Sequence, residues 1–486
     1  MHARARFGPA IVTCSSLACL VVGACTLGPG YVRPRMDTPK SWNGAPAPAG
    51  TRAAWPSTQW WQGFGSADLN EYIAQAQRTN DDLAAAIARV READAQARIA
   101  GAPLYPTVGA AATATRERAQ ASGGGLKTYN LFAPGISASY EIDFWGRNRA
   151  ALQAAEASAN ASRFDRATVE LTVMAGVANT YFLALELRDR VQIAHENLGS
   201  AQKIQHGLRV ERTAGTATGL DVAQQETTVA TLNASIPPLE QQLRQTTDAL
   251  AILLGRMPQE LDLMRGSLDD IRLPDVRPGL PSELLTRRPD IAQAEAQLMG
   301  AHANIAAARA AFFPSISLTG TGGFESTALA GLMSPGNRIW SIGAGLTQPI
   351  FEGGALHGQL EYSKARYDEL LADYHKAILT AFGNVEDALV ALQQTAEQQV
   401  RQQIAVEQAR RAFDFAQAQM RAGTINVLTL LNTQAALFGA EDSLAQVKYA
   451  HLQALVNLFQ ALGGGWQRDD SVPELKAIAE SRSDRS

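Results

Sequence analysis

The sequence predicts an internally duplicated α+β membrane protein, in which strands form a barrel shared between chains and long helices extend from it. Three observations lead to this prediction. The 486-residue chain repeats itself at a constant offset. Each copy holds two strand-like segments of alternating polarity and two helical runs far longer than the roughly 11–12 residues of a typical globular helix. The N-terminus carries an export signal.

The duplication shows as matching segments that lie 208 residues apart. The tripeptide "AGT" at 214–216 returns at 422–424, and Pro106 returns as Pro314. An internal repeat decides the whole architecture, so it is settled before other features. After the signal peptide we expect a lipidated tether and equatorial segment at 25–66, a first repeat at 67–270, a linker at 271–281, a second repeat at 282–465 and a tail at 466–486.

Four segments read as strands that cross a membrane. They lie at about 105–115, 131–143, 313–324 and 339–351. In the last, Trp340, Ile342 and Leu346 alternate with small or polar residues. About ten residues of apolar-out, polar-in alternation with aromatics near the ends is typical of transmembrane β-barrel strands. The competing interpretation is a set of water-soluble strands that cover a core.

Four strands are too few to close a barrel, and an open sheet edge is not tolerated in lipid. The barrel must therefore be shared between chains. Two chains would give eight strands and a filled interior, whereas three would give twelve and room for a channel.

The helical runs of each copy are expected in the same order. A run over 147–212 would extend about 100 Å at ~1.5 Å per residue, so such helices must pack lengthwise on one another. Gly215 and Gly423 stand where each long pair would reverse direction. The expected runs are 67–101, 147–212 and 219–255 in the first copy, and 282–310, 356–421 and 427–462 in the second.

The first 24 residues form an export signal, with Arg4 and Arg6 before an apolar core. "VVGAC" resembles a bacterial lipobox, in which Cys25 becomes the acylated first residue, and "CTLGPGYVRP" suits a flexible tether behind a lipid anchor. A plain signal peptide that is cut elsewhere is the alternative.

Aromatic residues at two places in the chain mark the expected membrane interface. Phe144 and Trp145 directly follow the strand at 131–143, where an Ala-rich helical run takes over. Trp340 lies near the start of the strand at 339–351. We expect all three at the membrane–water boundary, where aromatic girdles flank the apolar band of such barrels.

Several functional classes are excluded by what the sequence does not contain. The net charge of −4 gives no basic footprint, so no nucleic-acid partner is expected. There is no GxxxxGK[ST], GxSxG, HExxH or CxxC motif, and the seven histidines have no metal-ligand spacing. We therefore expect neither an enzyme nor a cofactor or metal.

Motifs along nearly the whole mature chain resemble one family. They are "CTLGPGYVRP", "YEIDFWGR" at 140–147, "RRPDIAQAEAQLMGAHANIAAARAAFFPSISLTG" at 287–320, "LTQPIFEGG" at 346–354 and "RAGTINVLTLLNTQAALF" at 421–438. The chain is similar to the trimeric outer-membrane efflux factors (TolC-like), in the lipoprotein branch that serves tripartite drug-efflux pumps of the RND type.

The resemblance implies a homotrimer with a twelve-stranded barrel in the outer membrane and an α-helical barrel across the periplasm. A periplasmic adaptor (membrane fusion) protein and an inner-membrane transporter would be its partners, besides the lipid of the outer membrane. Drugs or other small molecules would leave through the hollow axis of this passive, gated duct.

The resemblance also points to a periplasmic gate in "GTINVLTLLNTQA", 423–435. Leu428, Thr429 and Asn432 can share a helix face, and in a trimer each would form a ring. Leu428 would make an apolar constriction and Asn432 a neutral ring, where many relatives carry Asp. Asp221, which aligns with Thr429, is the candidate for the missing charge. The alternative is that Asn432 and Asp221 are ordinary surface residues.

Residues at the tips of the helical hairpins are candidates for adaptor docking: Arg212, Gly215, Arg421, Gly423 and Thr424.

Two other functions stay open at this point. A duct for type I protein secretion would use the same architecture, although the lipobox and "RRPDIAQAE" favour drug efflux. A structural envelope lipoprotein without a channel would have no use for lipid-facing Tyr140, Ile142 and Trp340.

Overall fold

The computed structural model describes residues 30–43, 55–120, 124–262, 265–276, 279 and 281–468. The chain divides into two compact units. Unit 1 comprises Met1–Arg35, Val90–Ser162 and Ala294–Tyr374. Unit 2 comprises Met36–Arg89, Arg163–Gln293 and His375–Ser486.

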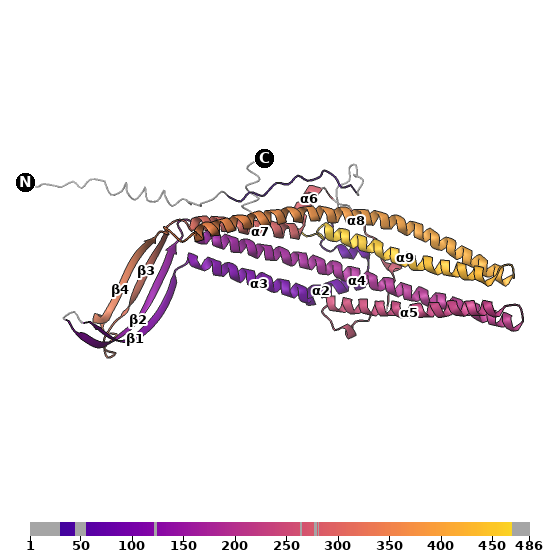
Figure 1. Cartoon of the computed structure of the whole chain (residues 1–486), viewed down its shortest axis with the longest axis horizontal. Helices are drawn as coiled ribbons and strands as arrows, with labels where there is room; N and C mark the ends of the chain where they lie inside the picture. Colours follow the sequence, from indigo (N-terminus) through magenta and orange to yellow (C-terminus); the bar gives the residue numbers. More distant parts are fainter. Residues whose placement is uncertain are drawn as a thin grey trace, which may run out of the picture. The chain divides into compact units, whose positions relative to one another are not determined.

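Unit 1 contains one antiparallel sheet in the order β1-β2-β3-β4 (Figure 1). Two hairpins form it, with β2 of the first lying beside β3 of the second. Among the described residues β1 and β4 therefore have one neighbour each and are edge strands. The strands are β1 (Thr107–Gln120), β2 (Leu126–Ile142), β3 (Ser315–Phe324) and β4 (Arg338–Thr347).

The register places the predicted polar and apolar faces on opposite sides of this sheet. Val108, Ala138, Gly320 and Ile342 are consecutive partners across the four strands, and they share the apolar face. The adjacent row on the other face is Thr107, Ser139, Thr319 and Gly343. Because side chains alternate along a strand, these rows extend the same two faces over the sheet.

The strand ends differ from the expected ones for local reasons. Tyr105 ends a short 3-10 turn and precedes Pro106, so β1 starts two residues later than predicted and runs on to Gln120. At the other edge, β4 ends at Thr347, two residues before Pro349, which has no N–H to donate. Gly124 and Gly125, with φ of 81° and 97°, close the β1–β2 connection.

The long helices confirm the repeat at an offset of 208. Helix α4 (Arg147–Thr213) is followed by α5 (Gly219–Leu253), and α8 (Ala355–Arg421) by α9 (Val427–Ala461). Each bound of α8 lies 208 residues after that of α4, 355 against 147 and 421 against 213. Figure 1 shows α5 returning alongside α4 and α9 alongside α8.

The two shorter helical runs are each broken once, which the sequence did not predict. The first consists of α2 (Ala67–Thr79) and α3 (Asp81–Gly101), and the second of α6 (Pro281–Arg287) and α7 (Pro289–Ala310). Asn80 is extended at the first break, and its Oδ1 accepts from the N–H of Leu83 at 3.0 Å. At the second break, Pro289 disfavours helical geometry for Arg288.

The main core of unit 2 is aromatic. Trp60 and Phe64, from the 3-10 turn η1 (Trp60–Phe64), pack with Phe182 of α4 and Phe459 of α9. The rings of Trp60 and Phe459 stack with centroids 5.0 Å apart. The other 3-10 turns are η2 (Ala102–Leu104), η3 (Pro258–Glu260), η4 (Leu268–Asp270) and η5 (Pro335–Asn337).

Within the described part of the chain, α4 alone holds a window apolar enough to cross a membrane, and 56% of that window is buried in the protein. Its apolar residues are therefore explained by packing, as Phe182 and Leu185 in the unit 2 core illustrate.

Candidate pore, gate and rim residues

The two hairpin tips have the same backbone geometry. Gly215 and Gly423 are left-handed, with φ of 80° and 69°. The next residue donates its N–H back across the turn in both, from Thr216 to the carbonyl of Glu211 at 2.9 Å and from Thr424 to that of Gln419 at 3.0 Å. This pattern is the Schellman motif, which favours glycine at the left-handed position.

The tip residues named as docking candidates divide into two kinds. Thr424 is tied to the turn, because its hydroxyl also donates to the carbonyl of Gln419 at 3.1 Å. Arg212 and Arg421 are exposed in the last helical turn before each glycine. Cations are favoured near a helix C-terminus, so both guanidiniums also stabilise the tips.

At the start of α9, the predicted gate residue Thr429 takes part in the N-terminal cap of the helix. Asn426 is the N-cap, and its Oδ1 accepts from the backbone N–H of Thr429 at 3.0 Å and from the Thr429 hydroxyl at 2.8 Å. The hydroxyl of Thr429 therefore holds the first turn of the helix together.

Asp221 has the corresponding position in the first repeat and completes a capping box with Thr218. Its Oδ2 accepts from the Thr218 N–H at 2.9 Å and from the Thr218 hydroxyl at 2.7 Å. These hydrogen bonds lower the pKa of the Asp221 carboxyl below its usual range. The carboxylate thus has a structural partner in its own helix turn.

Leu428 and Asn432 lie on the free face of α9. Leu428 is 49% exposed, and Asn432 is exposed one turn further along the helix. The opposite face fixes this orientation: Leu430 and Leu437 pack against Phe413 of α8, and Val427 packs against Leu208 of α4. Packing therefore leaves these two predicted gate residues available to face another surface or a lumen.

Further along α9, the free face continues with the exposed small residues Ala435, Ala436 and Gly439. Behind it, Gln434 is only 2% exposed, and neither of its side-chain polar atoms has a hydrogen-bond partner. The sequence analysis did not single out this glutamine, although a polar residue between Leu430 and Leu437 on the apolar stripe was a readable signal.

The rim motif "DFWGR" forms the strand-to-helix junction. Asp143 caps α4, since Oδ1 accepts from the N–H of Asn148 at 3.0 Å and Oδ2 from that of Arg149 at 2.9 Å. The Trp145 indole N–H donates to the carbonyl of Pro314 at 2.8 Å, and its ring stacks on Phe313 at 4.7 Å. Trp145 therefore joins the first repeat to the second, a role that the sequence analysis missed.

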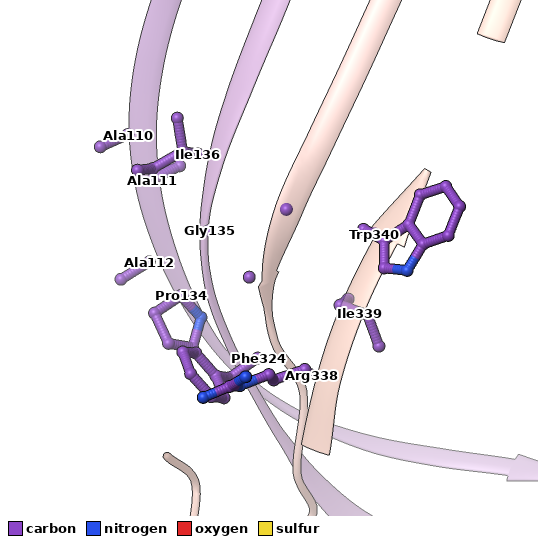
Figure 2. Close-up of a pocket in the computed structure, with 12 residues that line it drawn as sticks. Ala110, Ala111, Ala112, Pro134, Gly135, Ile136, Phe324, Arg338, Ile339 and Trp340 are labelled. Atoms are coloured by element: carbon purple, nitrogen blue, oxygen red, sulfur yellow. The ribbon is translucent and has the colours of Figure 1, made fainter. Parts of the chain in front are cut away.

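The other predicted interface residues are more open. Phe144 is 41% exposed, and Trp340 is 77% exposed on the apolar face of β4. An open hollow of about 850 Å³ lies on the sheet, and Trp340, Phe324 and Arg338 are among the residues that line it. Figure 2 shows Trp340 on one side of the hollow and Phe324 with Arg338 on another. Arg338 is the only ionisable residue among those that line the hollow, so the hollow offers no acid–base pair.

A second groove, of about 840 Å³, lies in unit 2 among α4, α5, α8 and α9. On its wall, Arg190 binds Asp442 at 2.7 Å and Glu186 at 3.2 Å. Burial raises the pKa of Glu186, while Arg190 acts against that shift. This partly buried ion cluster ties α4 to α9 and gives the groove a structural explanation.

Cys25 and the predicted signal peptide at 1–24 lie outside the described residues. The segment predicted as a tether is described from Gly30. Arg33 is docked in unit 1, where its Nε lies 3.0 Å from Glu295 and donates to the hydroxyl of Tyr374 at 3.1 Å.

Comparison with known proteins gives a family for this architecture. The family model "Outer membrane efflux protein" matches residues 72–256 and 280–464. The pyoverdine export outer membrane protein OpmQ of Pseudomonas aeruginosa is 42% identical over 93% of this chain and 96% of its own length. The probable efflux pump outer membrane protein TtgC of Pseudomonas putida is 33% identical over 96% of this chain and 98% of its own.

Solved structures agree with this result. The outer-membrane channel OprN matches with a TM-score of 0.84 and 29% identity, over 91% of this chain and all of its own. The open state of the MtrE channel of Neisseria gonorrhoeae matches with a TM-score of 0.82 and 28% identity, over 92% of this chain and all of its own. The duplicated fold, its four strands and its long helices therefore identify the chain as a member of the outer membrane efflux protein family, a non-enzymatic outer-membrane channel of efflux pumps.

Proposed function

We propose that this chain is the passive, gated exit duct of a tripartite pump and works as a homotrimer. The observation that carries the proposal is the sheet of unit 1, which has one apolar face, one polar face and, among the described residues, two open edges. Open edges are not tolerated in lipid, so the sheet must be completed by other copies. Three copies close a twelve-stranded barrel whose polar face lines the lumen.

The proposed division of the chain follows the repeat. Residues 67–270 and 282–465 form two repeats joined by 271–281, and 466–486 form a tail. Each repeat gives the barrel two strands and the helical part of the duct one long hairpin. The equal bounds of α4 and α8 at the 208-residue offset support this division.

We propose that residues 1–24 are removed and that Cys25 is acylated, which anchors the mature chain in the outer membrane. The docked tether supports this proposal. Tyr31, six residues after Cys25, packs edge-on against His302 with ring centroids 5.8 Å apart. Six extended residues reach about 20 Å, so a lipid on Cys25 would stay near unit 1.

The proposed cargo is a small molecule rather than a polypeptide. The relatives named above export pyoverdine or belong to an efflux pump, and another, ArpC of Pseudomonas putida, is an antibiotic efflux pump outer membrane protein. Since this chain matches them over more than nine-tenths of its length, we extend small-molecule export to it.

We propose Leu428 and Asn432 as the gate rings, with Thr429 and Asp221 acting through the caps that hold the first turns of α9 and α5. In a trimer, each lining side chain appears three times and sets the width and charge of the opening. An amide ring at Asn432 carries no charge, so the proposed constriction is apolar and neutral.

The hairpin tips are the proposed docking site for a periplasmic adaptor protein, which links the duct to an inner-membrane transporter. Arg212 and Arg421 would contact the adaptor, whereas Gly215, Gly423 and Thr424 would shape the turns that present them. The exposure of both guanidinium-bearing residues at the tips supports this assignment.

The gate proposal is tested by inward leak in cells. The Leu428→Gly/Asn432→Gly variant should sensitise cells to a large hydrophilic antibiotic that the intact outer membrane excludes. The matched control is Leu220→Gly/Gln224→Gly, which changes the aligned positions of the first repeat, and Leu220 is 66% exposed. Equal sensitivity of both variants, at equal trimer levels, would refute the assignment of the gate.

A further inference from the structure

We propose that Arg116, Arg118 and Arg338, at the ends of β1 and β4 that lie away from the helices, bind phosphate groups of the acylated glycolipid in the outer leaflet of the membrane. This inference rests on the proposed barrel, in which the apolar face of the sheet turns to lipid and these strand ends reach the outer leaflet. It adds the class of lipid and the side chains that recognise it.

The strand register divides the charged residues of the sheet between its two faces. Residues two apart on a strand share a face, so Arg116 and Arg118 lie on the face of Val108 on β1, and Arg338 lies on the face of Ile342 on β4. Val108 and Ile342 belong to the apolar face. The other charged residues of the four strands lie on the polar face: Glu117, Lys127 and Glu141. Within the strands, the apolar face therefore carries charge only as arginine.

The three arginines lie near the level of the outer membrane interface. Arg116 comes eight residues after Val108 on β1, and Arg338 comes eight residues before Leu346 on β4. Val108 and Leu346 are near the ends of these strands that connect to helices. Eight residues of a strand tilted by about 40° rise about 20 Å, and the apolar band of such a barrel is about 25 Å tall. The long arginine side chains can therefore reach the headgroups at the edge of the band.

Aromatic side chains mark the same level on the apolar face. Phe324 lies directly opposite Arg338 on the neighbouring strand. Trp340, two residues after Arg338, shares its face and is 77% exposed. Phe132 of β2 lies on this face as well. Since aromatic girdles flank the apolar band of membrane barrels, Arg338 stands among residues typical of the interface.

Nothing within the described part of the chain neutralises these arginines. No hydrogen bond or ion pair involves their side chains among the described residues, and all three residues are exposed. Glu117, which separates two of them in sequence, lies on the polar face and accepts from the Tyr129 hydroxyl at 3.3 Å. A charge on the lipid side of a barrel is unfavourable except near an interface. Three unpaired cations on this side therefore indicate an anion outside the chain.

The surface beside Arg338 leaves room for an acyl chain. Gly320 and Gly322 lie on the apolar face, neither is left-handed, and a Cβ at either would meet nothing within 4 Å. Trp340, although opposite Gly322, therefore does not cover it. On the polar face, by contrast, a Cβ at Gly323 would lie 2.4 Å from the carbonyl oxygen of Pro134. The chain itself thus requires glycine at 323 but not at 320 or 322, and glycine inside a strand often marks the close approach of a ligand.

The chemistry of the occupant follows from charge and place. The planar fork of an arginine matches the oxygens of a phosphate. Arg116 and Arg118 lie on β1 and Arg338 on β4, with β2 and β3 between them, so the surface offers two separate phosphate-binding positions. The outer-leaflet glycolipid has a disaccharide headgroup with a phosphate at each end and several acyl chains, whereas a glycerophospholipid has one phosphate. The glycolipid therefore complements both the arginines and the low apolar surface beside them.

The test measures binding of diphosphoryl lipid A to the full mature protein, purified in mild detergent and freed of lipid, by native mass spectrometry. Arg116→Gln/Arg118→Gln/Arg338→Gln should raise the dissociation constant at least tenfold, because glutamine lacks both the charge and the fork of donors. Arg338→Lys should fall between Arg338→Gln and the wild type, since lysine keeps the charge without the fork.

Lys127→Gln is the matched control for Arg338→Gln. It removes one cation from the same end of the sheet, but from the polar face, and should leave the dissociation constant within twofold of the wild-type value. Lipid A without its phosphates should bind at least tenfold more weakly than the diphosphoryl form.

The outcomes separate this inference from the proposed function. Unchanged binding by the triple variant, equal losses for Arg338→Gln and Lys127→Gln, or equally tight binding of phosphatidylglycerol would each overturn the glycolipid site. In each case a trimer that still conducts would leave the proposed duct intact. An absence of trimers in the unmodified protein would overturn both.

A thermal measurement gives a second readout from single substitutions of an exposed residue. Diphosphoryl lipid A in excess should raise the temperature at which the wild-type trimer dissociates in detergent, because a ligand that binds only the assembled state stabilises it. The rise should be smaller for Arg338→Gln and unchanged for Lys127→Gln. Equal rises in all three proteins would contradict a phosphate site at Arg338.

Discussion

Replacing Gly463 by alanine should destabilise the protein more than the same change at Gly423. Both glycines end a long helix in the left-handed region, with φ of 87° at Gly463 and 69° at Gly423. A Cβ at Gly463 would lie 2.0 Å from the carbonyl oxygen of Arg287, whereas a Cβ at Gly423 would have nothing within 4 Å. The first repeat has the same close approach, because a Cβ at Gly255 would lie 2.2 Å from the carbonyl oxygen of Thr79.

The expected losses of folding stability have two sources, the left-handed backbone of both glycines and the close approach of Arg287 at Gly463 alone. A left-handed non-glycine residue costs about 1–2 kcal/mol, and alanine recovers about 0.4–1 kcal/mol through the unfolded chain. These terms apply equally to both sites. At Gly463 the backbone of Arg287 must also move, and overpacking of this kind costs about 1–3 kcal/mol. We expect a net loss of about 1 kcal/mol for Gly423→Ala and about 2–4 kcal/mol for Gly463→Ala.

The assay is thermal unfolding of the purified protein in detergent, followed by circular dichroism at one fixed scan rate. A fixed rate matters because the midpoint of an irreversible transition depends on it. The Gly463→Ala midpoint should fall at least twice as far as that of Gly423→Ala. Equal shifts would refute the reasoning, since they would show that the contact with Arg287 adds nothing to the cost of the left-handed backbone.

Further predictions concern the rim, the caps and the ion cluster. Trp145→Phe keeps the stack on Phe313 but removes the hydrogen bond to Pro314, so it should cost about 1 kcal/mol in thermal denaturation, clearly less than Trp145→Ala. Thr218→Ala should cost about 1 kcal/mol by removing the N-cap of α5; faster proteolysis at the α4–α5 tip would report it, and an unchanged cleavage rate would contradict it. Because hydrogen bonds from Thr218 lower the Asp221 pKa from its ordinary 3.8, the carboxylate stabilises the tip above that pH. The stability difference between wild type and Asp221→Ala should therefore shrink as the pH falls below about 3.8 and on through the folded-state pKa, and a difference that stays constant would contradict this sign. Arg190→Ala leaves Glu186 and Asp442 without their cation and should cost about 3 kcal/mol, with partial recovery when Glu186→Gln is added; no recovery would show that the charge of Glu186 is not the cause.

The sequence predicts the long helices well because each helix occurs once in each repeat, and a glycine marks its C-terminal end in both copies. The expected run at 147–212 is observed as Arg147–Thr213, and that at 356–421 as Ala355–Arg421. Gly215 and Gly423 mark the reversals, since their left-handed geometry is a local property that the chain encodes directly. The alternation of apolar and polar residues along each strand is likewise a local property, and the observed registers place the two sets on opposite faces of the sheet.

Features that depend on tertiary contacts were missed. The break at Asn80 is stabilised by a hydrogen bond from its amide to the carbonyl of Leu253 at 2.9 Å, and the break at Arg288 by one from its guanidinium to Ala461 at 3.0 Å. Neither contact can be read from the flanking residues alone, although Pro289 was a visible signal for the second.

The proposed gate region contains one feature that the sequence predicts and one that depends on tertiary contacts. The spacing of Thr218 and Asp221 is that of a capping box, so the partner of Asp221 was readable from the sequence. The exposure of Leu428 and Asn432 could not be predicted from the sequence, because it depends on which face of α9 packs against Phe413 and Leu208.

The central claim is that trimers of this chain form a gated duct, and single-channel conductance in planar bilayers tests it most directly. The purified mature protein should give small, brief openings, and the Leu428→Gly/Asn432→Gly variant large and stable ones. Equal, steady conductance in both would contradict a gate at these rings. If neither conducts, although trimers and their insertion are verified, the account of the chain as an exit duct is wrong.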